Sequence, residues 1–497
     1  MAILGIDVGT SGCKICAFDS KGTVLTSSSR KYTELRGNGT REIVPDIVRT
    51  RVFEALEEIT YKCPDSIQAI CVTCLGESLV FLDENDQVLT NSMVTGDNRG
   101  SEGIDKICSE LSADYTFRTT GLMPSQLYSL PKLIWLYEHT DVIPKTSKIF
   151  FYEDYIGYLL TGERSVSYST AARSMAVDIH NLVWDNKLLS MAGLTSDYFS
   201  SLVPSGAIIG YVKSDLADRL NMKNKHIPVI AGAHDQVCAA LGCGFLDSAL
   251  ATDSIGTCEC LALMLPQKYD EKILKDLDMP CMIYPLPSSY FTTLEITTCG
   301  ALTNWARDTL FSGTKISCEK QGIDFFQYMD NRVSNLDTQV LILPQFGSSG
   351  HPDLNLSNMS GTICGLKLET TEEELYLALK ESMIYQIKLA HEHATPLGLE
   401  FERLIMSGGA AHSKISAQLR ADIYQRPVYS LTNNEAGTLG CMILAAVAIG
   451  EYPDLVTCVK EVVHYGTETL PDQTRFSIHQ EKYEKFKEFY NKMHDFK

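Results

Sequence analysis

The chain has 497 residues and a formal charge of −19 at neutral pH, with 44% hydrophobic and 21% charged residues. This length exceeds what one hydrophobic core usually serves, so we expect two globular domains. The excess of acidic residues argues against binding to nucleic acid or to an anionic membrane surface.

Apolar segments and cysteines indicate a protein of the cytoplasm. No run of 18 apolar residues is present, and a strand-like segment follows Met1 directly, so we expect neither a membrane span nor a signal peptide. The 16 cysteines are scattered, several inside apolar runs, which is typical of reduced and buried thiols. Their spacing offers no second ligand pair for zinc, so a cysteine metal site is not expected.

A Gly-Thr turn separates the first two apolar runs, which we predict to form a hairpin. Backbone N–H groups and hydroxyls at Gly9, Thr10 and Ser11 are suited to hold a phosphate, although a plain hairpin turn is the more common role of one such segment. Asp7, before the turn, either holds Mg²⁺ through water or simply forms the turn. Lys14, after it, is a candidate phosphate contact or a surface lysine.

Strand-like runs alternate with helical ones along the whole chain, which is typical of an α/β fold. A helix is predicted to begin at Pro45, with a buried stripe formed by Val48, Val52, Leu56 and Ile59. Strands are predicted at 69–73, 79–82, 228–231, 340–343 and 403–406.

Asp235 stands between a predicted strand and a helix of small residues. A carboxylate at this position either takes the proton of an alcohol as a general base or caps the helix, and capping is the more common role. The nearby Gly232 favours the catalytic interpretation, because it lets a ligand approach the backbone.

The turn pattern of the N-terminus returns in the middle of the chain. Asp253 precedes the pair Gly256-Thr257 between two further apolar segments. Two such turns indicate two similar domains that close on one phosphate chain. We place the domain boundary just before this hairpin, which gives domains at 1–247 and 248–497.

A third glycine-rich turn joins a strand to an amphipathic helix near the C-terminal end. Gly408, Gly409 and Ala410 form the turn, and Ser413 follows it. Free N–H groups and the helix dipole make such a turn a nucleotide site.

Two more helices are predicted in the second half of the chain. Thr371 and Glu374 form a capping box at the start of one. The other, at 435–442, carries small residues that allow either close helix packing or the approach of an adenine ring; packing is the simpler interpretation.

Taken together, these motifs resemble those of the FGGY carbohydrate kinases, the group of xylulose, ribulose, fuculose and glycerol kinases. Each motif alone is weak, but five in order, from Ile3 to about Tyr452, are specific. The shared segments are Asp7-x-Gly-Thr-Ser-x-x-Lys14, Gly232-x-His-Asp235-Gln236, Gly256-Thr257, Ser-Gly408-Gly409 and Glu435-Ala-x-x-Leu-Gly440.

The resemblance implies two ribonuclease H-like domains of the actin, Hsp70 and hexokinase type, with an interdomain cleft for ATP and Mg²⁺ and with the sugar on the first domain. Asp235 would be the base that deprotonates the acceptor hydroxyl. Mg²⁺ would be held by Asp7 through water and by Asp235. The ATP-binding residues would be Gly9, Thr10, Ser11, Lys14, Gly256, Thr257, Gly408, Gly409, Ala410 and Ser413.

The sugar site follows the family pattern only in part. Glu77 resembles the glutamate with which glycerol kinases hold their polyol, but Gly76 replaces the arginine before it. Asp97 and Arg99 resemble a family Asp-x-Arg, with Thr95 where a tryptophan is usual. The expected substrate-binding residues are Glu77, Ser78, Asp97, Arg99, Gln126, Asp235 and Gln236.

The sequence therefore predicts ATP-dependent phosphorylation of a small sugar or polyol hydroxyl, with a ketopentose such as xylulose as the first candidate. Fuculose, ribulose, glycerol, erythritol and gluconate stay open as substrates. A non-kinase ATPase and a regulatory sugar-binding protein of the same fold are the alternatives, since fold alone does not fix function. The expected partner is a small molecule, and a homodimer is left open.

Overall fold

The computed structural model describes residues 1–256, 258–296, 298–346, 360–433 and 435–494. The chain divides into two compact units: the first contains Met1–Leu246, Cys281–Tyr290 and Glu435–Val463, and the second contains Asp247–Pro280, Phe291–Asn434 and His464–Lys497. The domain boundary expected between 247 and 248 stays a prediction. The first unit is not one continuous stretch of the chain, because two later segments also belong to it. Among the described residues, no helix is long and apolar enough to cross a membrane.

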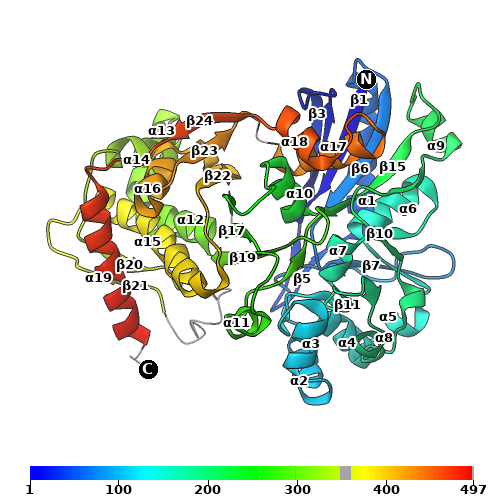
Figure 1. Ribbon diagram of the computed structural model, residues 1–497, viewed down its shortest axis with the longest axis horizontal. Helices are drawn as coiled ribbons and strands as arrows, with labels where there is room; N and C mark the ends of the chain where they lie inside the picture. Colours follow the sequence, from blue (N-terminus) through cyan, green and yellow to red (C-terminus); the bar gives the residue numbers. More distant parts are fainter. Residues whose placement is uncertain (257, 297, 347–359, 434, 495–497) are drawn as a thin grey trace. The chain divides into compact units, whose positions relative to one another are not determined.

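The first unit is built on a six-stranded mixed sheet (Figure 1). Its strands are β1 Ala2–Val8, β2 Gly12–Phe18, β3 Val24–Lys31, β6 Ile67–Cys74, β14 Ile208–Tyr211 and β15 Pro228–His234, in the order β14-β15-β6-β1-β2-β3. β1, β6 and β15 run parallel, and the others are antiparallel to their neighbours. The helices packed on this sheet are α1 Pro45–Lys62, α6 Tyr152–Thr161, α10 Asp235–Gly242 and α17 Ala436–Ala448.

Smaller elements complete the first unit. They are β4 Leu35–Arg36, β5 Arg41–Ile43, β7 Leu79–Leu82, β8 Ser92–Met93, β9 Lys148–Phe151, β10 Ser165–Ser167, β11 Val177–Asp178, β12 Val183–Trp184, β13 Ser201–Val203, β18 Met282–Ile283, α2 Ser101–Glu110, α3 Ala113–Thr120, α4 Ser129–His139, α5 Val142–Lys145, α7 Tyr168–Ala172, α8 Asn186–Ser190, α9 Ser214–Arg219 and α18 Leu455–Val462. The predicted stripe of α1 is confirmed, since Val48, Val52, Leu56 and Ile59 are all fully buried.

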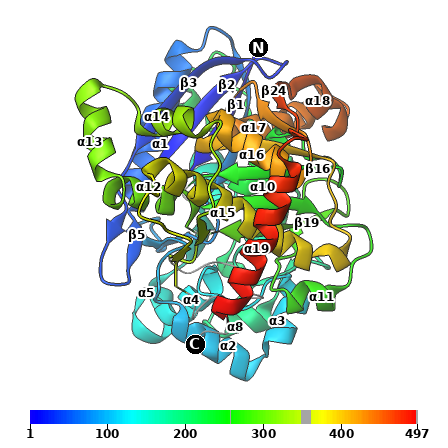
Figure 2. The same cartoon turned by 90° about the vertical axis from the view of Figure 1, so that its left-hand side faces the viewer.

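The second unit has a sheet of its own, formed by β16 Leu250–Ile255, β17 Glu259–Met264, β19 Tyr290–Ile296, β22 Arg403–Ser407, β23 Val428–Leu431 and β24 Tyr465–Thr469. Around it lie α11 Glu271–Asp276, α12 Cys299–Thr309, α13 Ser312–Gln321, α14 Phe325–Val333, α15 Glu372–His393, α16 Lys414–Tyr424, α19 Phe476–His494, β20 Leu341–Leu343 and β21 Thr362–Cys364. Figure 2 shows α19 beside α15 and α16, with which it packs. The predicted capping box of Thr371 and Glu374 is present at the start of α15.

The two sheets share one spatial order of strands, although the edge strand β14 precedes its neighbour β15 in the chain whereas β24 follows β23. In the second unit the order β19-β17-β16-β22-β23-β24 matches β3-β2-β1-β6-β15-β14, strand for strand and direction for direction. The two hairpin turns also close alike, because Gly9 N–H donates to the Gly12 carbonyl at 2.9 Å and Gly256 N–H donates to the Cys258 carbonyl at 2.8 Å. This confirms the prediction of two related α/β domains.

Small residues bring α10 and α17 of the first unit unusually close. A Cβ at Gly440 would lie 2.0 Å from the Cys238 carbonyl oxygen, and a Cβ at Gly242 would lie 2.0 Å from that of Ala436. Neither glycine tolerates a side chain without a shift of backbone. Of the two roles predicted for this segment, the structure shows close helix packing.

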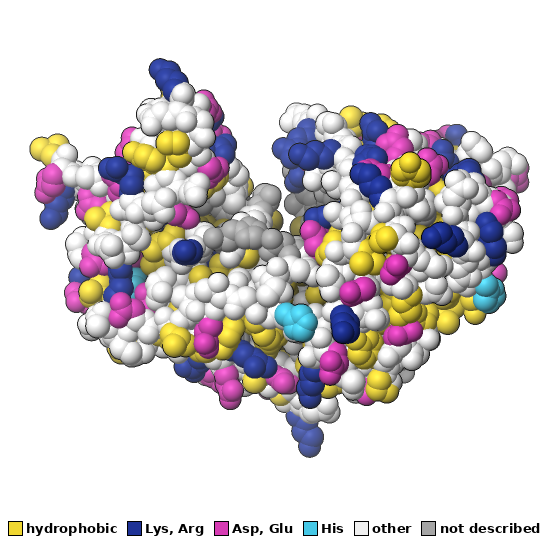
Figure 3. Space-filling view, turned by 90° about the horizontal axis from the view of Figure 1, so that it is seen from above, with side chains coloured by type: hydrophobic (Ala, Val, Ile, Leu, Met, Phe, Trp, Pro, Cys, Tyr) yellow, Lys and Arg dark blue, Asp and Glu magenta, His cyan; other side chains and the backbone are white. Residues whose placement is uncertain are grey.

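The surface carries charges of both signs. Figure 3 shows acidic, basic and hydrophobic side chains interspersed over one face. On that face the excess of acidic residues is spread out rather than gathered into one patch, which weakens the field that a distant ion would feel.

Candidate active site

Three acidic residues mark the same edge of the first sheet. Asp7 lies near the end of β1, Glu77 follows β6, and Asp235 follows β15. Because the carboxyl ends of neighbouring parallel strands share an edge, the three carboxylates converge there. The charges of Asp7 and Glu77 accordingly both influence Asp235.

Asp235 is the first residue of α10, and its side chain is 37% exposed. Its Oδ1 accepts a hydrogen bond from the Gln236 N–H at 2.6 Å and lies 3.1 Å from Nε2 of His234. In the described part of the chain, Oδ2 has no hydrogen-bond partner. Desolvation raises the pKa of this carboxyl; His234 opposes the rise, and Asp7 and Glu77 add to it. Such an oxygen is suited to accept a proton.

His234 and Asp235 stand at the start of α10. The N-cap residue is His234, and Asp235 at the next position accepts a hydrogen bond from the Gln236 N–H of the first turn, so the choice between general base and helix cap stays a prediction. Gly232 serves a different purpose from the one predicted: a Cβ there would lie 2.0 Å from the Val72 carbonyl oxygen of β6. The close approach of β15 to β6 requires this glycine, and no ligand is needed to explain it.

Asp7 is the partly buried carboxylate of the first hairpin. Desolvation raises its pKa to about 6; Glu435 adds to the rise and Lys14 opposes it. The ammonium group of Lys14 is ion-paired with the Glu435 carboxylate. Its charge is therefore already engaged, and the contact of Lys14 with a phosphate stays a prediction.

Glu77 is held in a strained and buried position. Its φ is 60° and it is 3% exposed. Its carboxylate accepts hydrogen bonds from Arg173 Nε at 2.6 Å and from Thr95 Oγ1 at 3.0 Å. Desolvation favours a higher pKa, but the charges of Arg173, His234 and Lys132 outweigh it, so the pKa of Glu77 is lowered. A positive φ at a non-glycine residue costs about 1 to 3 kcal/mol and is typical of functional sites.

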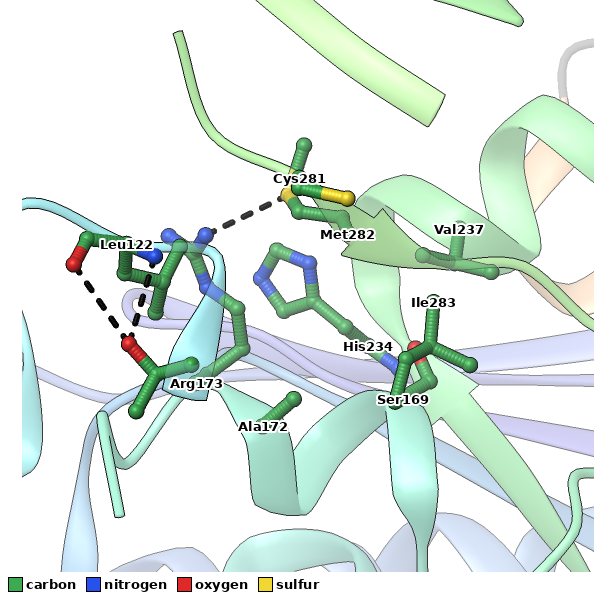
Figure 4. A pocket seen from close by; sticks show the side chains of 10 residues that line it. Leu122, Ser169, Ala172, Arg173, His234, Val237, Cys281, Met282 and Ile283 are labelled. Carbon is green, nitrogen blue, oxygen red and sulfur yellow. Dashed lines mark hydrogen bonds between the residues drawn. The ribbon is translucent and has the colours of Figure 1, made fainter. Parts of the chain in front are cut away.

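A small pocket, with a cavity volume of about 10 Å³ that suits one water molecule or one hydroxyl group, lies beside these residues in the first unit (Figure 4). One side of its lining is polar and includes Ser169, Arg173 and His234. The other side is apolar, and Met282 and Ile283 reach it from β18, a segment far along the chain. The remaining lining residues are Thr120, Leu122, Ala172, Val237 and Cys281.

Asp97 and Arg99, like Glu77, do not line this pocket. Asp97 has no exposed surface; it accepts hydrogen bonds from the Arg41 N–H at 2.8 Å and from the N–H and guanidinium of Arg99. Arg99 also pairs with Glu42 at 2.6 Å. This network fixes the loop, so the geometry gives the two residues a structural role, and a direct sugar contact stays a prediction.

The other predicted sugar residues differ in their surroundings. Gln126 accepts a hydrogen bond from Ser101 Oγ at 2.7 Å and does not line the pocket of Figure 4. Ser78 Oγ and Gln236 Oε1 are buried and have no hydrogen-bond partner among the described residues. Buried polar atoms are normally paired, so these two are candidates for a ligand contact.

A second pocket lies in the second unit beside the β16–β17 hairpin. Gly256, Gly409 and Ser413, all predicted to bind ATP, line it. Ser413 caps α16 and donates to Asp330 at 2.5 Å, and Lys380 pairs with Asp330 at 2.8 Å. The apolar side chains of the lining include Ile255, Phe326 and Met383, together with the ring of Tyr376.

The third glycine turn contacts this hairpin directly. Gly408 has φ +80°, and a Cβ there would lie 2.6 Å from the Ile255 carbonyl oxygen. Ala410 lies in the following 3₁₀ turn, Gly409–His412. Thr257, predicted to contact a phosphate, lies outside the described residues.

A buried ion-pair triad underlies the second hairpin. Arg420 of α16 donates from Nε to Asp253 at 2.6 Å and pairs through Nη2 with Glu259. All three side chains are less than 5% exposed. Asp253, near the end of β16, is thus paired with a cation inside the protein.

Comparison with known proteins decides the family. Two models match the chain: the N-terminal domain of the FGGY family of carbohydrate kinases at residues 2–242, and its C-terminal domain at 251–449. The chain belongs to the FGGY family of carbohydrate kinases. This FGGY kinase is 26% identical to a gluconokinase of Bacillus licheniformis over 90% of the chain and 88% of that protein. It is 24% identical to a xylulose kinase of Lactococcus lactis, over 98% and 96%.

A solved structure supports the same fold. The ligand-bound xylulose kinase from Lactobacillus acidophilus is similar to this FGGY kinase with a TM-score of 0.86 and 23% identity, over 99% of this chain and 98% of that one. The family membership confirms the predicted phosphotransferase that acts on an alcohol group of a carbohydrate. Kinases of this family use ATP as the phosphoryl donor.

The FGGY kinase offers a donor set that Mg²⁺ accepts. Mg²⁺ takes oxygen ligands, keeps several waters and is usually held by one or two carboxylates together with substrate phosphates. Asp7 and Asp235 at one sheet edge supply two such carboxylates. Among the described residues, no group of three or more His, Cys, Asp and Glu side chains forms a complete cage. The residues therefore fit a hydrated Mg²⁺ rather than a tightly caged ion.

Sequence reasoning missed four residues of these two pockets. His234 lies inside a recognised motif but was given no role. Arg173 follows a run of small residues and carries no local signal, since its partner Glu77 is 96 residues away. Lys380 and Asp330 are 50 residues apart in the sequence and lie on different helices, so they meet only in the folded FGGY kinase.

Replacing Asp7 by Asn is expected to raise the free energy of unfolding at pH 7.5 by about 1 to 3 kcal/mol. The pKa of Asp7 in the folded protein is raised to about 6. The contribution of this group to the free energy of unfolding is therefore fully present below its ordinary pKa and is lost as the pH rises through 6. Urea unfolding measures the gain, which should fall by more than half at pH 4.5. Exposed Asp105→Asn is the control, and an equal gain in both variants would contradict the argument.

Replacing Gly256 by Val is expected to weaken ATP binding by about ten-fold or more, because a branched side chain would occupy the space of the phosphates. Folding should survive, since among the described residues a Cβ at Gly256 meets no atom closer than 3.8 Å and its φ is not positive. Gly408→Ala is the contrasting variant, because its Cβ would clash with Ile255 and lower stability itself. Calorimetry and thermal melting separate the two effects.

Proposed function

We propose that this FGGY kinase transfers the γ-phosphoryl group of ATP to a hydroxyl of a small neutral ketose or polyol, with a ketopentose such as xylulose as the first candidate. The arrangement of Asp235 carries the proposal: Oδ1 is fixed by Gln236 and lies beside His234, and Oδ2 is left for the substrate hydroxyl. Relatives named xylulose kinase and gluconokinase support a sugar as acceptor.

In the proposed reaction, Asp235 accepts the proton of the acceptor hydroxyl as the phosphoryl group arrives. Mg²⁺ held by Asp7 and Asp235 would offset the negative charge of the phosphates. The glycine turns at Gly256 and Gly409 leave room for the phosphates of the nucleotide beside backbone N–H groups. Glu77 accepts hydrogen bonds from sugar hydroxyls, in the charge-assisted geometry that carboxylates offer.

The charges around the pocket favour a neutral substrate. Glu77 and Arg173 form an ion pair and largely cancel each other. Without bound Mg²⁺, Asp7 and Asp235 leave a net negative charge at the sheet edge, which repels a sugar phosphate or a sugar acid. A hydroxyl-rich neutral sugar meets no such repulsion.

A substrate panel tests the proposal. Ketopentoses, deoxyketoses, tetritols, glycerol and gluconate are each incubated with ATP and Mg²⁺, and ADP release is followed with and without sugar. The expected result is ADP release that depends on a neutral ketose or polyol. ATP hydrolysis that no sugar alters would overturn the kinase proposal in favour of a bare ATPase.

Replacing Glu77 by Gln is expected to raise the KM of the best sugar by roughly 10- to 100-fold, because a charge-assisted hydrogen bond is worth about 1.5 to 3 kcal/mol. The dissociation constant of ATP should stay near wild type, since the glycine turn predicted to bind the nucleotide at Gly408 and Gly409 belongs to the second unit. Asp97→Asn is the matched control; its carboxylate is fully engaged with Arg41 and Arg99, so its loss should lower stability more than sugar affinity. Equal KM effects in both variants would remove Glu77 from direct sugar contact.

A further inference from the structure

His234 lines the pocket of Figure 4 and, within the described part of the chain, has an unpaired polar atom, the ring nitrogen Nδ1. The residue is 4% exposed. The ring atom Nδ1 is buried and has no hydrogen-bond partner among the described residues. Figure 4 shows the imidazole ring between Arg173 and Met282. An unsatisfied buried nitrogen is costly, so a ligand that pairs with it gains affinity.

The contact made by the other ring nitrogen, Nε2, determines whether Nδ1 donates or accepts a hydrogen bond. Nε2 lies 3.1 Å from Oδ1 of Asp235. A carboxylate at this distance favours the tautomer with the proton on Nε2, which leaves a lone pair on Nδ1. Nδ1 is then a hydrogen-bond acceptor, and its natural partner is a hydroxyl group.

We propose that His234 is a specificity-determining residue whose Nδ1 accepts a hydrogen bond from one hydroxyl of the bound sugar, so that the kinase selects a neutral ketose carrying a hydroxyl there over the matching deoxy sugar. This inference rests on the proposed kinase function and identifies the sugar hydroxyl that the same pocket recognises.

Two substitutions separate the nitrogens of the ring. Asparagine places its amide near the position of Nδ1, and glutamine places its amide near that of Nε2. His234→Asn therefore keeps a partner for the sugar hydroxyl and loses the contact with Asp235, whereas His234→Gln does the reverse. The probes are D-xylulose and its 3-deoxy and 4-deoxy analogues, and the readouts are kcat and KM for each.

The wild-type enzyme should phosphorylate one deoxy analogue roughly 5- to 100-fold less efficiently in kcat/KM than D-xylulose. His234→Asn should keep this ratio and lose kcat alone, and His234→Gln should bring the ratio close to one. His234→Leu, which has no polar atom, should also abolish the discrimination and serves if the glutamine variant does not fold. Thermal melting and ATP calorimetry establish that each variant is intact.

Retention of the full ratio in both His234→Gln and His234→Leu would overturn the inference, as would equal use of all three sugars by the wild type. A failure of the proposed function looks different: the wild type would phosphorylate none of the three while still binding ATP, and that result would remove both proposals together.

Discussion

Replacing Asp235 by Asn is expected to lower kcat about 10²- to 10⁴-fold, the usual range for losing a general base. The amide keeps the shape of the side chain and can still accept the hydrogen bond of the Gln236 N–H, but it cannot take the proton of the sugar hydroxyl. The dissociation constant of ATP, measured by calorimetry, and the melting temperature should both stay close to wild type.

The control for this variant is Asp215→Asn. Asp215 is an exposed aspartate in the first turn of α9, as Asp235 is in the first turn of α10, so both changes remove the same charge from a helix N-terminus. Only the Asp235 variant should lose turnover. Full activity of Asp235→Asn would leave the residue with a merely structural role.

The hairpins and their turns could be predicted because their signals are local. Gly9 and Gly256 each stand between apolar runs, and the turn they form needs only a few neighbouring residues. The capping box of Thr371 is equally local and is present as predicted. Since the shared order of strands follows from two such hairpins and their parallel neighbours, the fold class was within reach of the sequence.

The pocket of Figure 4 could not be predicted, because the residues that meet there are distant in the chain. Arg173 meets Glu77 across 96 residues, and Lys14 meets Glu435 across 421. Met282 reaches the pocket from a segment that lies beyond the first unit's main stretch. Gly232 was misinterpreted for the same reason, since the carbonyl of Val72 that requires it belongs to another strand.

The repeated hairpins have also taken different roles. Asp7 and Asp253 both precede their turns, but they lie at different strand positions: in the two hairpin registers Ser254, and not Asp253, matches Asp7. Asp7 stays partly exposed near Asp235, where a metal ion can be held, whereas Asp253 is enclosed and paired with Arg420. The second hairpin thus keeps the turn geometry for phosphates while its carboxylate serves the core.

Replacing Arg420 by Met is expected to lower the free energy of unfolding of the second unit by about 3 to 5 kcal/mol, the range for breaking a buried ion pair by removing one partner. Methionine fills much of the space, but Asp253 and Glu259 are left buried without a cation. Urea unfolding measures the loss. Exposed Arg403→Met, in the same unit, is the control and should change stability by less than about 0.5 kcal/mol.

The pH dependence of this loss gives its cause. Desolvation and the charge of Glu259 raise the pKa of Asp253, and Arg420 opposes them, so removing Arg420 raises it further. A carboxyl group whose pKa is raised in the folded state contributes fully to the free energy of unfolding below its ordinary pKa, and this contribution is lost as the pH rises through the raised pKa. The deficit of Arg420→Met should therefore be larger at pH 8 than at pH 5, where protonation relieves the unpaired charges. A deficit that is independent of pH would assign the loss to packing of the arginine stem instead of to its charge.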